Sequence, residues 1–400
     1  MSTAPTGDSK TDATPGGQWI GPRPSNLELF AIMFVGIAGI MIAGVGPDLL
    51  GNLERTGRLT ASQLGQAFAA ELLTLGIAAF ASGAALKPER LKLIGIVMAL
   101  ALTALNAATP MFSGDMVIAV RAVAGLPSGV LMWITIAMIA RTPTPERWSG
   151  AYLAIQTLAQ LLMSRLIGPA TGSYGADAGW YVLAAFFAVT AVLAFFAPDR
   201  LAPLPRAEGH SGLPGGLGWV ALVSAFLYSG FTICVFTYQG SLSGQAGHAP
   251  DVANTSYSVS LAAQVAGAGI ATVLAGRVNW LWTVIIAAAA TGAVIYGLYL
   301  LPSPNTFLVL SGAFGFLWLF VLPFLVPMVI EADPTRRAAV LIGGAQVLGG
   351  SFAPFIASLL VTTTDARGAL LFSAACMIVA VLIAFTVHQI RPKSAAVTKE

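Results

Sequence analysis

The chain has 400 residues, of which 56% are hydrophobic and only 9% are charged, and its formal net charge is +3. Soluble domains carry about 25% charged residues, so this composition excludes a soluble globular protein and indicates an integral protein of the lipid bilayer. The small net charge, with basic residues scattered between apolar runs, excludes a nucleic-acid partner.

Residues 1–26 are polar and rich in Pro, Gly, Ser and Thr. They lack the apolar core and cleavage site of a signal peptide, so they are predicted to form a disordered tail. Apolar runs of about 20 residues then predict twelve transmembrane helices in two groups of six. The first group is expected at 27–50, 63–86, 93–112, 116–140, 150–171 and 180–197, and the second at 217–240, 253–276, 281–301, 306–330, 338–361 and 368–390.

The predicted fold is therefore all-α, with two pseudo-symmetric six-helix bundles. The amino-terminal bundle is expected at 27–197 and the carboxy-terminal bundle at 217–390. Between them, residues 198–216 are rich in Pro and Gly and are predicted to be a linker, and residues 391–400 form a second tail.

The distribution of basic residues predicts the orientation. If the amino terminus is cytoplasmic, fifteen of the 20 Lys and Arg residues lie in cytoplasmic segments, three on the opposite side and two inside helices. This bias obeys the positive-inside rule. Both termini and the linker are therefore predicted to be cytoplasmic in a multi-pass protein of the plasma membrane, specifically a bacterial inner membrane, where the chain is expected to act as a monomer.

A weak internal repeat supports two related bundles. The segment FAAELLTLGIAAFASG, residues 68–83, aligns without gaps on LAAQVAGAGIATVLAG, residues 261–276, with six identical positions. Gln264 stands in the second segment where Glu71 stands in the first. One half therefore keeps a group that can carry a proton, and the other keeps only its polar shape.

Three ionisable side chains fall inside predicted helices, where charge is costly and often functional. Glu71, Arg121 and Arg165 lie at a similar depth, somewhat toward the outer side, so we expect them to share a polar cavity. Glu71 can be a proton site, or a structural ion pair with one arginine. Each arginine can serve function, bond backbone carbonyls or extend to an interface.

Other candidates are weaker. Asp48 can line the path of a solute through the membrane, or it can lie in water at the end of the first helix. The amides of Gln156 and Gln346 lie at matching places in two helices and can bind solute or hydrogen-bond one helix to another. Aromatic residues of the second half, including Tyr228 and Trp318, can pack in the core or form an apolar wall of a binding site.

The sequence offers no catalytic site, metal site or cofactor motif. The three histidines lie in the linker, an outer loop and a helix end, and no Walker-type phosphate loop occurs. The two cysteines, Cys234 and Cys376, lie in apolar runs and are expected to be packing residues. The chain is therefore not expected to be an enzyme, and transport would draw on an ion gradient.

The chain resembles the major facilitator superfamily in three features: two groups of six helices, a central linker, and Arg121-x-x-x-Gly125-x-x-x-Gly129 on the fourth predicted helix. The resemblance implies a role for Arg121 in proton coupling. The loop GAALKPERLK, residues 83–92, keeps the first glycine and the basic character of the superfamily's loop motif, but has Lys87 at the Asp position. Gly168-Pro169-x-x-Gly172 resembles the core of an antiporter motif.

The leading hypothesis is a proton-coupled secondary active transporter of a small amphipathic organic solute, working by alternating access. Glu71 is expected to carry the proton, with Arg121 and Asp48 assisting. Arg165, Gln156, Gln264, Gln346, Tyr228 and Trp318 are the expected solute-binding residues. Arg165 suits a carboxylate-bearing solute and uptake by symport, which is slightly favoured; the alternatives are a drug/proton antiporter and a non-transporting sensor or scaffold.

Overall fold

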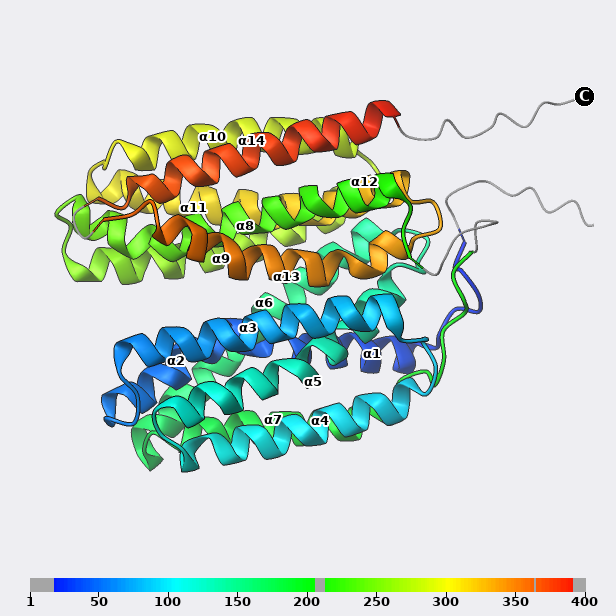
Figure 1. Ribbon diagram of the computed structural model, residues 1–400, viewed down its shortest axis with the longest axis horizontal. Helices are drawn as coiled ribbons and strands as arrows, with labels where there is room; N and C mark the ends of the chain where they lie inside the picture. The colour runs from blue at the N-terminus through cyan, green and yellow to red at the C-terminus, as the bar shows by residue number, and fades with distance from the viewer. Residues whose placement is uncertain (1–17, 206–212, 363–364, 391–400) are drawn as a thin grey trace, which may run out of the picture.

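The computed structural model describes residues 18–205, 213–362 and 365–390, and within these ranges the regular structure is helical (Figure 1). The amino-terminal half contains α1 (Asn26–Gly39), α2 (Met41–Arg55), α3 (Ala61–Ala85), α4 (Leu91–Ala108), the 3-10 helix η1 (Thr109–Met111), α5 (Asp115–Ile139), α6 (Pro145–Tyr174) and α7 (Ala178–Ala194). The carboxy-terminal half contains α8 (Gly216–Gln245), α9 (Pro250–Leu274), α10 (Trp280–Tyr299), α11 (Pro304–Val321), η2 (Leu322–Phe324), α12 (Leu325–Ala332), α13 (Arg337–Ser358) and α14 (Arg367–Ile390). Residues 1–17 of the predicted first tail (1–26), residues 206–212 of the predicted linker (198–216) and the whole second tail, 391–400, lie outside the described residues. The rest of the first tail leads into α1, and the Ile20 amide there donates to the Arg141 carbonyl at 2.9 Å.

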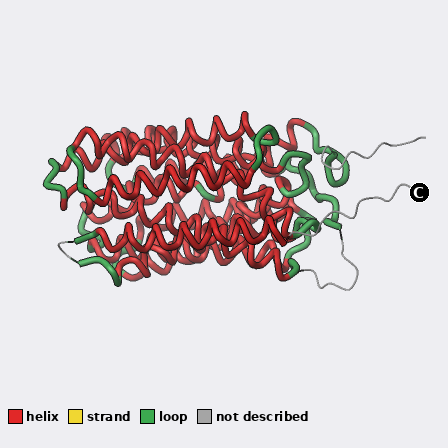
Figure 2. Tube along the Cα trace, turned by 90° about the horizontal axis from the view of Figure 1, so that it is seen from above, coloured by secondary structure: helices red, strands yellow, loops and turns green. Residues whose placement is uncertain are grey.

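The twelve predicted spans match these helices, and two of them are interrupted. The first span divides at Ile40 into α1 and α2. The tenth divides into α11, η2 and α12, where Pro323 lacks the amide hydrogen that a continuous α-helix requires. By length and composition, ten segments of the described chain are suited to cross a membrane. The helices run roughly parallel, and Figure 2 shows their loops gathered at the two ends of the bundle.

Short polar motifs fix where the helices begin. Ser25 accepts a hydrogen bond from the backbone amide of Glu28, and the Glu28 carboxylate accepts one from the Ser25 amide at 2.8 Å. Thr60 and Gln63 form the same reciprocal pair at the start of α3. These capping boxes satisfy backbone amides that a helix start leaves free. They set the depth at which the polar residues of α1 and α3 lie.

The two halves repeat one helix pairing. In the first half α5 packs along α3, and in the second α11 packs along α9. Glycines allow both approaches, because a Cβ at Gly125 would overlap the carbonyl oxygen of Glu71, and one at Gly315 would overlap that of Ser260. The internal repeat predicted from the sequence therefore corresponds to a repeated unit of packing.

The halves meet at the end of the bundle where α1 begins and α14 ends, called here the termini end. There α3 and α5 pack on α13, and α6 packs on α9. The Arg336 guanidinium, from the second half, donates hydrogen bonds to the carbonyl oxygens of Ala140 (3.0 Å) and Thr142 (2.8 Å) in the first. Toward the opposite end, Phe355 and Leu359 of α13 are exposed, and the two halves diverge (Figure 1).

Candidate functional site

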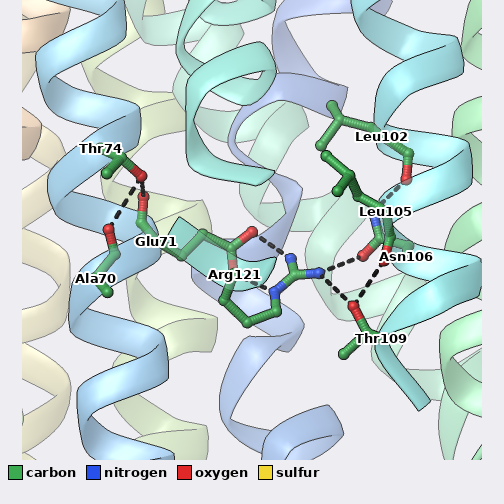
Figure 3. Close-up of polar contacts among 8 residues, drawn as sticks. All are labelled: Ala70, Glu71, Thr74, Leu102, Leu105, Asn106, Thr109 and Arg121. Atoms are coloured by element: carbon green, nitrogen blue, oxygen red, sulfur yellow. Dashed lines mark hydrogen bonds and ion pairs between the residues drawn. The ribbon is translucent and has the colours of Figure 1, made fainter. Parts of the chain in front are cut away.

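A buried ion pair joins α3 to α5 inside the amino-terminal half. Nε of Arg121 donates to Oε2 of Glu71 at 2.8 Å, and Nη2 of Arg121 donates to the other carboxylate oxygen (Figure 3). The side chains of both residues are 1% exposed. A bidentate pair of this kind combines two charge-assisted hydrogen bonds with one fixed orientation. The prediction that Glu71 and Arg121 meet is confirmed.

Three further side chains complete the surroundings of Arg121. Its Nη1 donates to Oδ1 of Asn106 at 3.0 Å and to Oγ1 of Thr109 at 3.1 Å. Its guanidinium carbon lies 4.9 Å from the ring centroid of Trp180 on α7. The guanidinium therefore has polar partners on α4 and η1 in addition to its carboxylate, and an aromatic face that favours a cation.

Asn106 and Thr109 are held in place by backbone carbonyls of α4. The Asn106 amide donates to the Leu102 carbonyl at 2.7 Å, and the Thr109 hydroxyl donates to the Leu105 carbonyl at 2.7 Å (Figure 3). These bonds fix both side chains, and the side-chain oxygen of each accepts from Arg121. Sequence reasoning missed both residues and Trp180. A buried Asn in an otherwise apolar helix is the signal that could have found the first.

The expectation that Arg165 shares a polar cavity with Glu71 and Arg121 is wrong. Arg165 is exposed on α6 and has no hydrogen bond or ion pair with any described residue, whereas Glu71 and Arg121 are sealed from solvent. The reason lies in helix placement, since α6 packs against α2, α7 and α9 while the ion pair lies between α3 and α5. Two residues predicted at the same depth in the membrane can therefore lie on helices that do not bring them together.

Asp48 lies apart from the ion pair as well. Its Oδ2 accepts a hydrogen bond from the hydroxyl of Ser164 at 3.0 Å, which joins α2 to α6 at an exposed position. Ser164 precedes Arg165 in the chain, so a carboxylate and a free guanidinium flank the same turn of α6. This second polar group is distinct from the buried pair.

The three predicted glutamines occupy different environments. Gln264 on α9 is 4% exposed and its Nε2 has no partner among the described residues. Gln156 on α6 and Gln346 on α13 are half-buried. Because a buried amide without a partner loses its hydrogen bonds to water, Gln264 marks a position where a polar ligand or water would be favoured.

The two predicted aromatic residues also differ. Tyr228 is 1% exposed, and its ring lies 4.7 Å from that of Phe231, so in this conformation it is a core residue without access to a solute. Trp318 is half-buried, and its ring lies 5.5 Å from Phe236, which in turn lies 5.1 Å from Tyr257. This cluster joins α8, α9 and α11 and was only partly anticipated.

The described residues offer no set of three His, Cys, Asp or Glu side chains placed to hold a metal ion. The site therefore consists of a sealed ion pair in one half and separate exposed polar groups on α2 and α6. Such an arrangement can hold and exchange a proton and can present charge to a solute.

Neither a family model nor a curated protein matches this sequence. Solved structures do match. A major facilitator superfamily transporter, FucP, in the outward conformation, is 14% identical, with a TM-score of 0.71 over 90% of this chain and 98% of that one. The proton:xylose symporter XylE is 14% identical, with a TM-score of 0.70 over 91% of this chain and 96% of its own.

A third match is the human organic anion transporter MFSD10, 13% identical, with a TM-score of 0.67 over 91% of this chain and 100% of its own. At these identities the likeness concerns the fold, and it extends over nearly the whole length of each protein. The chain is therefore a multi-pass membrane protein with the fold of the major facilitator superfamily transporters.

Proposed function

We propose that the chain is a proton-coupled secondary active transporter of a small amphipathic organic solute. The observation that carries the proposal is the ion pair of Glu71 and Arg121. Among the described residues, Glu71 is the one carboxylate-bearing residue with a whole-residue exposure of 0%, and it faces a guanidinium that has other partners. Two proton symporters, FucP and XylE, share the fold.

The surroundings of the pair favour an asymmetric response to a proton. A proton on Glu71 would remove its negative charge and weaken both hydrogen bonds to Arg121. Asn106 and Thr109 would still hold the guanidinium on the α4 side. Protonation would therefore loosen α3 from α5 while leaving Arg121 in place.

Helix α3 can transmit this change to the interface between the halves. Beyond Glu71 along α3, Gly76 packs against Leu348 of α13. Further along, Gly83 packs against Leu341 of the same helix. A shift of α3 would alter these contacts, which seal the termini end. We infer that proton binding is linked to the contact between the halves, as alternating access requires.

The solute is proposed to bind between the halves, with Arg165 as the anchor for a negative group. Arg165 is an exposed arginine of α6 without a partner among the described residues, and its neighbour Ser164 donates a hydrogen bond to Asp48. Gln156, Gln264, Gln346 and Trp318 are proposed to supply the polar and aromatic contacts. The organic anion transporter among the structures of this fold supports a carboxylate-bearing solute.

Location and direction belong to the same proposal. Basic residues gather at the termini end, so this end is proposed to face the cytoplasm of a bacterium, with the chain in the inner membrane as a monomer. The contacts between the halves lie at that end. The conformation is then closed to the cytoplasm, which suits a transporter that receives its solute and proton from outside.

A drug/proton antiporter is the second candidate. The observation in its favour is the segment Gly168-Pro169-x-x-Gly172 on α6, where a Cβ on either glycine would meet no atom within 4 Å. Such open backbone suits a large apolar solute. A non-transporting sensor or scaffold is the third, and it predicts that no solute crosses.

Reconstitution distinguishes the three. A thermal-shift panel of organic acids, aromatic compounds and cationic drugs would identify a ligand, because a ligand of the folded state raises its apparent stability. Proteoliposomes with an imposed inward proton gradient should then accumulate that ligand. Extrusion of preloaded ligand under the same inward proton gradient favours the antiporter, and recovery of a partner protein with no flux favours the scaffold.

A further inference from the structure

A cavity of about 190 Å³ lies at the termini end of the amino-terminal half, away from the ion pair. It is bounded by the segment that precedes α1, the end of α5 and the start of the connection to the second half. Three arginines and one glutamate line it, Arg23, Arg141, Arg200 and Glu28, together with Trp19 and Pro198.

The arginines of this cavity have no acidic partner in the ranges that the structure describes. Nε of Arg141 donates to the Ala202 carbonyl at 2.7 Å and its Nη1 to the Ala137 carbonyl at 2.6 Å. Arg23 donates to the amide oxygen of Asn26 at 3.2 Å. All of these acceptors are neutral, so the positive charges are solvated in part but not compensated.

The one carboxylate in the lining is already engaged. Oε2 of Glu28 accepts hydrogen bonds from the amide and the hydroxyl of Ser25, both at 2.8 Å, in the capping box of α1. It offsets one charge of three. The cavity therefore has a surplus of positive charge.

Arg141 shows what this surplus means energetically. It is 4% exposed, and burial lowers its pKa to about 10, so it remains protonated at neutral pH. A buried guanidinium with only neutral partners is unfavourable, and an anion that accepts hydrogen bonds from it relieves that state.

We propose that this cavity binds a phosphate group, either of a lipid headgroup or of a free phosphorylated molecule. Guanidinium groups match the geometry of phosphate oxygens, and the buried Arg141 lines the cavity together with two exposed arginines, Arg23 and Arg200. Trp19, whose ring lies 5.8 Å from that of Trp148, places an aromatic pair at the same edge, as at a membrane interface.

The occupant would hold the connection between the halves against the first half. Residues on either side of the cavity are already tied there, since the Ile20 amide donates to the Arg141 carbonyl at 2.9 Å and the Leu201 amide to the Pro88 carbonyl at 3.0 Å. Phosphate bridging Arg23, Arg141 and Arg200 would add to these ties. Binding should therefore raise the melting temperature of the whole chain.

The test uses the full chain in a neutral detergent and phosphate-free buffer, with inorganic phosphate titrated at constant ionic strength. The melting temperature should rise and saturate. In R23Q/R200Q, which changes only exposed side chains, the phosphate affinity should fall at least about tenfold. R277Q removes an exposed arginine of the other half at the same end and should leave the affinity unchanged.

Lipid added to micelles of the phosphate-free neutral detergent separates the two sources. A shift of the wild type, lost in R23Q/R200Q, with phosphatidylglycerol added to these micelles but not with inorganic phosphate assigns the site to a lipid headgroup. The reverse pattern assigns it to a free phosphorylated molecule. No shift with either probe, or equal shifts in the wild type and R23Q/R200Q, overturns the proposal.

Discussion

At the scale of single residues, the ion pair of Glu71 and Arg121 is where the amino-terminal half concentrates its buried charge. Taking two charges out of water is unfavourable, and their attraction offsets this only when geometry and further hydrogen bonds are good. Here the pair is bidentate, and Asn106 and Thr109 satisfy the remaining guanidinium donor. The pair is therefore tolerated because it is complete, and it becomes unfavourable when one member is missing.

Removing one partner should destabilise the protein more than removing both. Glu71→Ala leaves a buried guanidinium that cannot lose its proton, so we expect the free energy of unfolding to fall by about 3–5 kcal/mol. In the double variant Glu71→Ala/Arg121→Leu, part of this loss should be recovered. Denaturant unfolding in mixed micelles measures both. Strictly additive effects of the two changes would show that the residues are not coupled.

At the scale of helices, close backbone approach holds the site together. A Cβ at Gly129 would lie 2.7 Å from the Ala79 amide nitrogen on α3, so the glycines of α5 allow the contact that places Arg121 against Glu71. The same argument applies to α9 and α11 through Gly315. In both halves small residues, and not large apolar ones, determine which helices can pair.

Gly125→Ala should force α5 away from α3, and we expect it to lower the free energy of unfolding by about 1–3 kcal/mol. Gly168→Ala on α6 is the matched control. A Cβ there meets nothing within 4 Å, and alanine favours a helix more than glycine does, so stability should stay the same or rise. Equal losses in the two variants would contradict this account of the α3 and α5 contact.

The loop between α13 and α14 should respond to acid. Hydrogen bonds from Arg367 and Gln245 lower the pKa of Asp365 below its ordinary value. This group stabilises the loop at pH values above the unfolded pKa of 3.8, and the contribution is lost as pH falls below that value toward the lower folded pKa. Protection of the Ala366 and Arg367 amides from hydrogen exchange should therefore decrease below about pH 4.

Asp365→Asn provides the comparison for this loop. The variant keeps the shape of the side chain but not its charge, so its amide protection should be lower at neutral pH and nearly independent of acid. Protection in the wild type that stays constant from pH 7 to pH 2 would show that Asp365 does not tie the loop to α8.

At the scale of the whole molecule, the two halves are joined at the termini end. Arg336 is central to this contact, because its guanidinium donates hydrogen bonds to two carbonyls of the other half. Its backbone is in the left-handed conformation, with φ of 60°. The carbonyls are those near the end of α5, so one side chain of the second half also caps a helix of the first. These hydrogen bonds add to the apolar packing of α3 on α13 that closes this end.

Arg336→Ala should shift the protein toward a state that is open at the termini end. Loss of these charge-assisted hydrogen bonds is expected to change the population ratio about tenfold. Spin labels at Lys87 and Arg277, which are exposed on different halves, report the distance after Cys234 and Cys376 are replaced. Arg147→Ala, at an exposed position of the same end, is the control and should leave the distances unchanged.

Helix positions were predictable because each membrane span is an apolar run of about 20 residues that can be read from the sequence alone. The contact between Glu71 and Arg121 was predictable because an isolated charge inside a membrane is unfavourable, which favours pairing with the opposite charge. The separation of Arg165 was not predictable, because it depends on which helices are neighbours and which way α6 is rotated. Asn106 and Thr109 were missed for a related reason, since their role arises only when α4 turns them toward Arg121.

Proton coupling through Glu71 is the central claim, and a Glu71→Gln variant in proteoliposomes tests it most directly. Glutamine keeps the size of the side chain and accepts a hydrogen bond from Arg121, but it cannot take up a proton. We predict that the variant exchanges its ligand across the membrane at a rate near that of the wild type and fails to accumulate it under an imposed pH gradient. Uphill accumulation by Glu71→Gln equal to that of the wild type would contradict the account.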